Sequence, residues 1–372
     1  IARSKTLIGN LGFFSSLDIK EVESIKPGYS DLIVQVGETS TGEVSFGGGY
    51  SSQVGGILNI GVTEKNFLGK GQRISVNAKL SERESDYTAS FSEPYFLDRD
   101  LYSSFSLYNN TLDYKESRYS LKREGFDMSG NFSLSEYIRQ STTYSLEKRN
   151  LKPRDGASAS IFSEQGETTL SQVSTSLNMD TRSSSINPND GYNLSLSSAI
   201  AGIGGDKKFI KILTSGNYYI SYNDDNILLS LGYNSGLIMG LGQDILISDR
   251  FFLGGNSFKG FKQSGLGPRD TASQGSLGGN IFYTGTIKTT FGIGLPPELG
   301  LRGNWFTTFG SISGVDKSTV AYLDNSSIRM STGIGISWSS PFGPISIILS
   351  EALLKEDYDI TESISFGIGT KF

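Results

Sequence analysis

The residue types that most often carry covalent or acid–base chemistry are absent from this chain. It contains no Cys and no His, which excludes a thiol nucleophile, a His-based catalytic triad and a zinc–thiolate site. Glycine pairs such as Gly202-Ile203-Gly204 do not open a helix after a strand, and residues 314–318 lack the Walker spacing, so neither predicts nucleotide binding. The acidic pair Asp224-Asp225 is typical of a solvated turn. We therefore expect a protein that is not an enzyme, holds no metal and needs no cofactor.

The composition favours a sheet with one apolar face and one wet face. Only 36% of the residues are hydrophobic, yet 11% are aromatic and 46 are Gly. A β-barrel in a membrane combines these properties because it meets lipid outside and water inside. The net charge of -5, without a visible basic stripe, argues against nucleic acid as a partner.

From residue 42 onward, apolar residues recur at every second position, which is the period of a strand with one exposed face. Val44 and Phe46 share a face near the start of this region, and Phe366 and Ile368 share one near its end. We count about sixteen such runs, an even number that suits a closed bacterial barrel, although residues 109–165 are hard to divide. A soluble sandwich or propeller would need a dry core, whereas the face opposite the apolar one carries Ser, Thr, Asn and Gly. The sequence predicts an all-β fold, with a transmembrane antiparallel barrel over residues 41–372.

The first forty residues differ from the rest. Residues 3–11 could form a short helix that Gly12 terminates, and two short strands should follow near residues 17–22 and 31–36. One helix and two strands are half of a small α+β domain, which we place at residues 1–40. The chain opens without Met and without a signal peptide, so we expect a fragment of a longer precursor.

One interruption between strands, at about residues 240–274, is too long for a plain turn. Loops of this length in a compact domain are usually functional or disordered. Shorter hairpin signals lie at Ser51-Ser52-Gln53, at residues 223–226 and at Ser340-Pro341-Phe342-Gly343.

Several short motifs occur in an order that is specific, although each alone is weak. They resemble the BamA family of outer-membrane assembly factors, in which a barrel follows polypeptide-transport-associated (POTRA) domains. The matching pieces are Leu11-Gly12-Phe13-Phe14, Gly47-Gly48-Gly49-Tyr50-Ser51, Asn66-Phe67-Leu68-Gly69, Ser92-Glu93-Pro94-Tyr95-Phe96, Asn187-Pro188-Asn189-Asp190-Gly191-Tyr192, Arg250-Phe251-Phe252-Leu253-Gly254-Gly255 and Gly265-Leu266-Gly267-Pro268-Arg269. The resemblance implies that residues 1–40 are the end of the last POTRA domain.

The resemblance also implies that the long loop folds into the barrel lumen. The family has Val/Ile-Arg-Gly-Phe at the tip of this loop, and its Arg contacts acidic and aromatic groups of the wall. Here Lys259 replaces that Arg, and Thr308 replaces a wall Asp, so we expect other contacts to hold the loop. Alternatively, Gly260 only allows a tight turn between two aromatic residues. The candidate loop residues are Phe258, Lys259, Gly260, Phe261, Gly254, Gly255, Gly267, Pro268 and Arg269.

A third set of candidates lies where the first and last strands must meet. Glycine weakens a strand, so the run of Gly near residue 48 could loosen this seam, and the resemblance implies a lateral gate there. Alternatively, the glycines make room for bulky neighbours or for the inserted loop. The chain ends in an alternating segment with a final aromatic residue, which resembles the β-signal of bacterial barrels. The candidate gate residues are Gly47, Gly48, Gly49, Phe366, Gly367, Gly369 and Phe372.

These features predict a protein of the bacterial outer membrane, with its N-terminal segment in the periplasm. Its function would be the assembly and insertion of other β-barrel proteins through the lateral gate. The expected partners are unfolded outer-membrane proteins, outer-membrane lipids and accessory assembly lipoproteins. A translocation barrel of the TamA or two-partner-secretion type, or a passive porin, remains an alternative.

Overall fold

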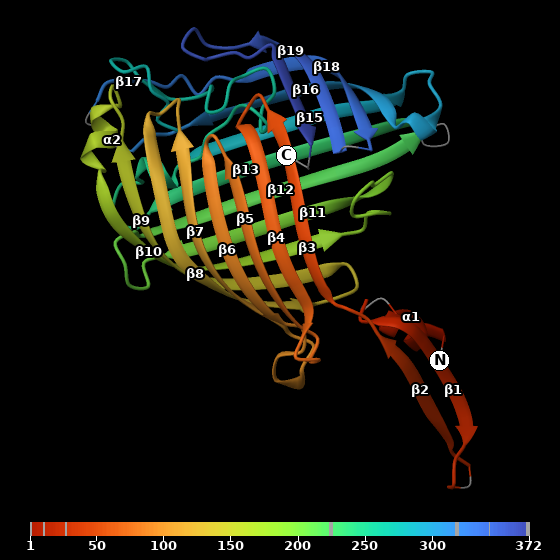
Figure 1. Ribbon diagram of the computed structural model, residues 1–372. Helices are drawn as coiled ribbons and strands as arrows, with labels where there is room; N and C mark the ends of the chain where they lie inside the picture. Colours follow the sequence, from red (N-terminus) through yellow and green to blue (C-terminus); the bar gives the residue numbers. More distant parts are fainter. Residues whose placement is uncertain are drawn as a thin grey trace.

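The computed structural model describes residues 2–9, 12–26, 28–222, 226–316, 320–341 and 343–369. Within these ranges, a small N-terminal unit precedes a large closed barrel (Figure 1). None of the helices in the described ranges is long and apolar enough to cross a membrane.

The N-terminal unit consists of one helix and one antiparallel hairpin. Helix α1 spans Ala2–Gly9, and strands β1 (Phe14–Glu23) and β2 (Ser30–Glu38) pair with Leu17 opposite Val36. Gly12 has a positive φ of 69°, and its N–H donates to the carbonyl of Gly9 at 3.2 Å. The described helix reaches Gly9, and residues 10 and 11, the last two of the expected helix, lie outside the described residues.

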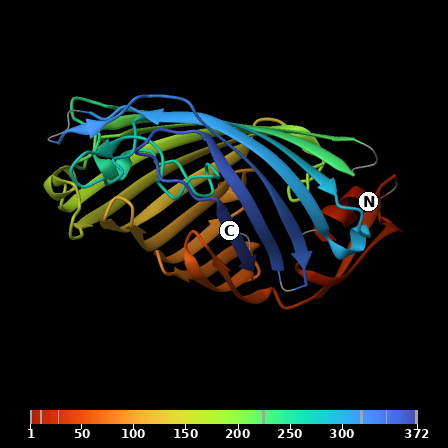
Figure 2. The ribbon, with the colours of Figure 1, turned by 90° about the horizontal axis from the view of Figure 1, so that it is seen from above.

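Sixteen strands of the described chain close into one antiparallel barrel, so the predicted fold class is confirmed. Each barrel strand pairs with its neighbours along the chain, and β20 pairs with β3 to close the ring (Figure 2). The strands are β3 (Gly42–Ser51), β4 (Gly55–Phe67), β5 (Gln72–Ser81), β6 (Glu84–Glu93), β7 (Tyr102–Tyr114), β8 (Tyr119–Ser133), β9 (Ile138–Pro153), β10 (Gly166–Asp180), β11 (Asp190–Ala201), β12 (Phe209–Tyr222), β13 (Ile227–Gly240), β15 (Ile281–Gly292), β16 (Leu301–Ser313), β18 (Arg329–Ser340), β19 (Gly343–Leu354) and β20 (Ile364–Gly369).

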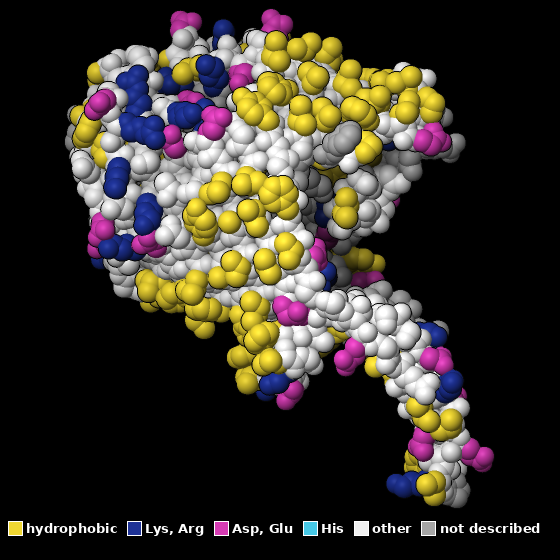
Figure 3. All heavy atoms as spheres, viewed as in Figure 1, with side chains coloured by type: hydrophobic (Ala, Val, Ile, Leu, Met, Phe, Trp, Pro, Cys, Tyr) yellow, Lys and Arg dark blue, Asp and Glu magenta, His cyan; other side chains and the backbone are white. Residues whose placement is uncertain are grey.

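The alternation seen in the sequence separates the two faces of the barrel wall. In β20, Ile364, Phe366 and Ile368 are exposed on the outside, whereas Ser365 and Gly367 are buried on the inside. Apolar side chains gather in large patches on the outer surface (Figure 3). Such a surface suits lipid, and ring closure gives every barrel strand of the described chain a paired neighbour on each side.

The longest connection, residues 241–280, folds into one end of the barrel. We call this end the distal end, because the N-terminal unit lies at the other (Figure 1). The loop contains a short 3₁₀ helix, Ile247–Asp249, and the two-residue strand β14 (Arg269–Asp270), which pairs with β17 (Tyr322–Leu323). Helix α2 (Ala159–Ser163), between β9 and β10, packs Ile161 against Ile247 of this loop. The loop therefore supplies much of the apolar core that the described barrel encloses.

Candidate functional site: the barrel seam and the inserted loop

The seam between β3 and β20 is the shortest strand pairing of the described barrel. It comprises three residue pairs, Gly367–Ser51, Ile368–Tyr50 and Gly369–Gly49, whereas β3 pairs with β4 over ten. One further backbone hydrogen bond, from the N–H of Ser52 to the carbonyl of Phe366 at 3.0 Å, crosses the seam. Phe372 lies outside the described residues.

Two of the predicted gate glycines allow the two backbones of the seam to approach closely. A Cβ atom on Gly49 would lie 2.4 Å from the carbonyl oxygen of Ile368, and one on Gly369 would lie 2.5 Å from that of Gly48. Such distances would force the strands apart. The close neighbour is thus the backbone of the opposite strand, and not a bulky side chain or the loop. On the outer face, the Tyr50 and Phe366 rings stack across the seam at 5.6 Å.

The loop motif is anchored in the lumen by its two aromatic residues. Phe258 and Phe261 meet edge to face at 5.3 Å and are 1% and 0% exposed. They pack with Leu253 and Leu266 of the loop and with Ile312 of β16. The loop tip is therefore held by an apolar cluster on the wall.

Lys259 anchors the loop to the wall through its backbone carbonyl. Its ammonium donates to Asn256 of the same loop at 2.6 Å, while its carbonyl accepts from the Ser331 hydroxyl of β18 at 2.6 Å. Gly260 adopts a positive φ of 90°, and a Cβ there would lie 2.8 Å from the Cβ of Ser331. Thr308 shares a hydrogen bond with Thr286 at 3.1 Å. A hydroxyl–carbonyl contact thus takes the place of the ion pair that the family resemblance would imply.

The loop also pairs with the segment that leads into β20. Lys262 donates its N–H to the carbonyl of Ile360 at 2.9 Å, and Ile360 donates to the carbonyl of Gly265 at 2.9 Å. Glu362 donates its N–H to the carbonyl of Gly260 at 3.0 Å. The loop therefore fixes the start of the last strand, which no sequence motif indicated.

Glu362 connects this segment to the other side of the seam. Its carboxylate accepts from the amide of Gln53, in the β3–β4 turn, at 2.5 Å, and Gln53 is only 6% exposed. A cavity of about 310 Å³ lies beside this contact, lined by Gln53, Lys259, Ser365 and other residues of the seam. The structure thus brings the loop motif and the seam, which the sequence presented separately, into one site.

Three buried ion pairs, two of which share Asp249, hold the rest of the loop region. Asp249 of the loop binds Arg149 of β9 and, at 2.8 Å, Lys207. Arg329, at the start of β18, binds Asp359 at 2.9 Å. The charge order at Asp249 is the reverse of the family expectation, since the loop supplies the acid and the wall the base.

The remaining predicted loop residues form its buried turns. Arg269 is 1% exposed and donates to the carbonyls of Gly265 at 2.9 Å and Gln274 at 3.0 Å. The carbonyl of Pro268 accepts from the N–H of Leu277 at 2.9 Å. The glycines at the predicted positions, Gly254, Gly255 and Gly267, all have positive φ.

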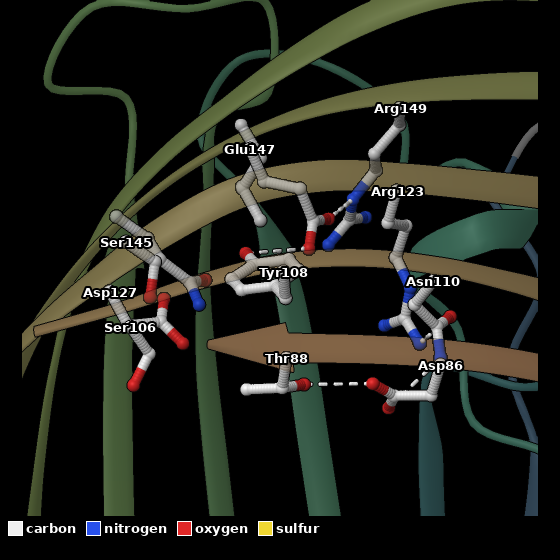
Figure 4. A pocket seen from close by; sticks show the side chains of 12 residues that line it. Asp86, Thr88, Ser106, Tyr108, Asn110, Arg123, Asp127, Ser145, Glu147 and Arg149 are labelled. Carbon is white, nitrogen blue, oxygen red and sulfur yellow. Dashed lines mark hydrogen bonds and ion pairs between the residues drawn. The ribbon is translucent and has the colours of Figure 1, made fainter. Parts of the chain in front are cut away.

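The lumen wall formed by β6 to β10 is polar and charged. A cavity of about 410 Å³ is lined by side chains of β6 to β10, among them Asp86, Arg123 and Glu147 (Figure 4). The Tyr108 hydroxyl donates to Glu147 at 3.0 Å. Within the described ranges, no group of three or more acidic residues is arranged to hold a metal ion.

An apolar outside, a polar inside and closed pairing of sixteen strands in the described chain define a transmembrane β-barrel. Within this class of transmembrane β-barrels, the long loop inserted beside a short seam is a further distinguishing feature of the described chain. The chain belongs to the Omp85 superfamily, whose domain model matches residues 66–372.

Relatives within this superfamily identify a BamA-type outer-membrane barrel. The chain is 33% identical over 375 residues to the outer membrane protein assembly factor BamA of Neorickettsia risticii, covering 100% of this chain and 50% of the relative. It is 25% identical over 400 residues to the sorting and assembly machinery component 50 homolog of Bos taurus, covering 100% and 82%. The crystal structure of Haemophilus ducreyi BamA lacking POTRA domains 1–3 has the same fold, with a TM-score of 0.87, 19% identity, and coverage of 100% and 78%. The chain spans about half the length of the bacterial relatives it matches.

Proposed function

We propose that this barrel assembles and inserts β-barrel proteins into the bacterial outer membrane, with the seam between β3 and β20 as its lateral gate. The observation that carries the proposal is the short, glycine-lined pairing of these two strands in the described chain. The Neorickettsia risticii relative is an outer membrane protein assembly factor, which agrees with this function.

Separation of the seam would expose a strand edge to a client. An unpaired edge presents N–H and C=O groups that an incoming strand can bind by β-augmentation. Glycines on β3 leave the backbone accessible, and burial of the client's apolar face in lipid would supply free energy without a nucleotide. The partners in this proposal are unfolded outer-membrane proteins, membrane lipids and accessory lipoproteins. Residues 1–40 would be the end of a POTRA domain in the periplasm.

A disulfide across the seam tests the gate. Ser51 and Gly367 are directly paired, and paired antiparallel residues have a Cα separation that a disulfide can bridge. The chain has no Cys of its own, so the variant Ser51→Cys with Gly367→Cys contains one defined pair. We expect oxidation to abolish the folding of a client barrel in proteoliposomes, measured by its heat-modifiable gel mobility, and reduction to restore it.

The matched control joins β3 to the strand that stays paired with it. Ser45 and Gly61 face each other in the β3–β4 pairing, so the variant Ser45→Cys with Gly61→Cys should remain active when oxidised. Full activity of the oxidised seam variant would contradict the gate. Equal loss in both variants would show that the disulfide acts on folding and not on opening.

A further inference from the structure

One acidic side chain, Glu351 of β19, points out of the barrel. Outward and inward positions alternate along this strand, so Leu349 and Glu351 are exposed outside, whereas Ser350 is buried. Ala352 packs against the inserted loop on the inside. The carboxylate of Glu351 is therefore on the face that meets lipid.

Apolar residues surround Glu351 on this outer face. Leu349 is 50% exposed and Leu353 is 49% exposed on the two sides of it along β19. Its partner in β18 is Thr332, which is followed on the same face by Ile334 at 59% exposure. Figure 3 shows apolar side chains gathered over this part of the barrel. The carboxylate thus interrupts an apolar surface.

The position of Trp338 indicates the depth of Glu351. Trp338 lies two residues from the end of β18 near the N-terminal unit, where a membrane-interface aromatic residue is expected. Thr332, opposite Glu351, is six residues further along β18, or roughly 20 Å along the strand and about 15 Å along the membrane normal at the usual tilt. Because the apolar band of such barrels is about 25 Å tall, Glu351 lies in its distal half, roughly 10 Å from the distal interface where lipid headgroups lie.

Two outward-facing acids elsewhere on the barrel pair with a lysine. Glu167 binds Lys148 at 2.8 Å, and Glu124 binds Lys122. Within the described residues, Glu351 has no such hydrogen bond or ion pair. An ionisable group at membrane depth is costly without a partner, so its counter-charge should come from outside the chain.

A cavity of about 370 Å³ adjoins this carboxylate on the outer face. It is lined by Glu351, Trp305 of β16, Thr332, and Ser363 and Ile364 at the start of β20, among others. Trp305 is 41% exposed and contributes an aromatic ring. A carboxylate and an indole beside one cavity both attract a cation: the first by charge and hydrogen bonding, the second through the face of its ring.

We propose that this cavity binds the primary ammonium group of a phospholipid. A primary ammonium can donate three hydrogen bonds to the carboxylate and the nearby hydroxyls. A quaternary ammonium has no N–H to donate. A lipid is the occupant because this face meets the membrane while the barrel is closed. The site touches the last strand, so the bound lipid would lie beside the seam. This inference does not depend on the proposed function.

The two tryptophans of the chain make the site directly measurable. They are Trp305 and Trp338, so Trp338→Phe leaves Trp305 as a single reporter beside the cavity. This variant is reconstituted into vesicles that contain brominated phosphatidylethanolamine, phosphatidylcholine or phosphatidylglycerol at equal mole fraction. We expect the ethanolamine lipid to quench Trp305 preferentially. Adding Glu351→Gln should reduce this preference about tenfold, since one lost charge-assisted contact corresponds to about that change in affinity.

The control Glu167→Gln removes an outward-facing acid on the other side of the barrel, and it should leave the preference unchanged. Heat-modifiable mobility confirms that each variant is folded. Equal quenching by the three lipids, stronger quenching by the glycerol lipid, or an unchanged preference in Glu351→Gln would overturn the proposal. Preferential quenching by a brominated lysine-containing strand peptide would assign the cavity to a protein client instead.

Discussion

At the scale of single residues, Arg329 joins the barrel wall to the inserted loop. Its guanidinium binds Asp359 at 2.9 Å, and Asp359 also accepts from the N–H of Gly267 in the loop at 3.3 Å. Tyr358 adds its hydroxyl at 3.1 Å. Since Arg329 is 1% exposed, its charge has little access to water if these partners are removed.

Asp359→Ala should therefore destabilise the barrel strongly. Removal of one partner from a buried ion pair typically costs about 3–5 kcal/mol, because the other charge stays buried and uncompensated. Replacing both partners, as in Arg329→Met with Asp359→Leu, should cost less than the single change. The measurement is urea-induced unfolding from lipid vesicles, and a loss below about 1 kcal/mol for Asp359→Ala would show that water reaches the guanidinium.

At the scale of elements, the β9–β10 connection contacts the base of the inserted loop through Glu164. This residue follows α2, and its carboxyl accepts from the N–H of Ile247 at 2.9 Å. Burial raises the pKa of Glu164 from 4.5 to about 7; the Ile247 N–H, Arg250 and Lys207 act in the opposite direction, and Asp249 adds to the rise. The contact is thus sensitive to pH near neutrality.

The contribution of Glu164 to the free energy of unfolding should fall as the pH rises from 4.5 to about 7. The pKa of Glu164 is higher in the folded state than in the unfolded chain, so the neutral carboxyl contributes fully below pH 4.5 and its contribution is lost as the pH passes 7. The loss is on the order of 3 kcal/mol. Glu164→Gln keeps a neutral side chain at every pH. The unfolding free energy of the variant minus that of the unchanged protein should therefore rise over this range. A difference that stays constant between pH 4.5 and 7.5 would contradict this coupling.

At the scale of the whole molecule, the described residues close the barrel through a small set of contacts at the distal end of the seam. Glu362 is bound to the loop by its backbone and to Gln53, across the seam, by its side chain. The backbone hydrogen bond from Ser52 to Phe366 lies beside it. The loop, the first hairpin and the last strand are therefore held together at one point.

Glu362→Ala should loosen closure without affecting the adjoining hairpin. A hydrogen bond to a charged group contributes about 1.5–3 kcal/mol, so the Ser52 amide should exchange with deuterium roughly ten to a hundred times faster. Amides in the β3–β4 pairing, such as that of Val62, serve as the internal reference and should exchange at their original rate. Unchanged exchange at Ser52 would mean that the three strand pairs suffice to close the barrel.

The sequence by itself determined the type of wall and the type of loop. Alternation of apolar and small polar residues, as in residues 364–369, specifies which face of each strand meets lipid, because the period of a strand is local. The tight turn at Gly260 was predictable because a positive φ between two aromatic residues is also a local property, whereas the insertion of the loop was implied by the family resemblance. These features require no knowledge of distant contacts.

Only the tertiary structure decided what the candidate residues touch. Gln53 and Glu362, which hydrogen-bond to each other, are 309 positions apart in the chain, and no periodicity relates them. The same holds for Asp249 and Arg149, whose pairing reverses the expected order of charges. Glu351 and Thr332 pair within one hairpin, but only the assembled wall brings Trp305 of β16 and Ser363 beside them. Long-range pairing in a closed barrel sets these contacts, and side-chain period alone cannot.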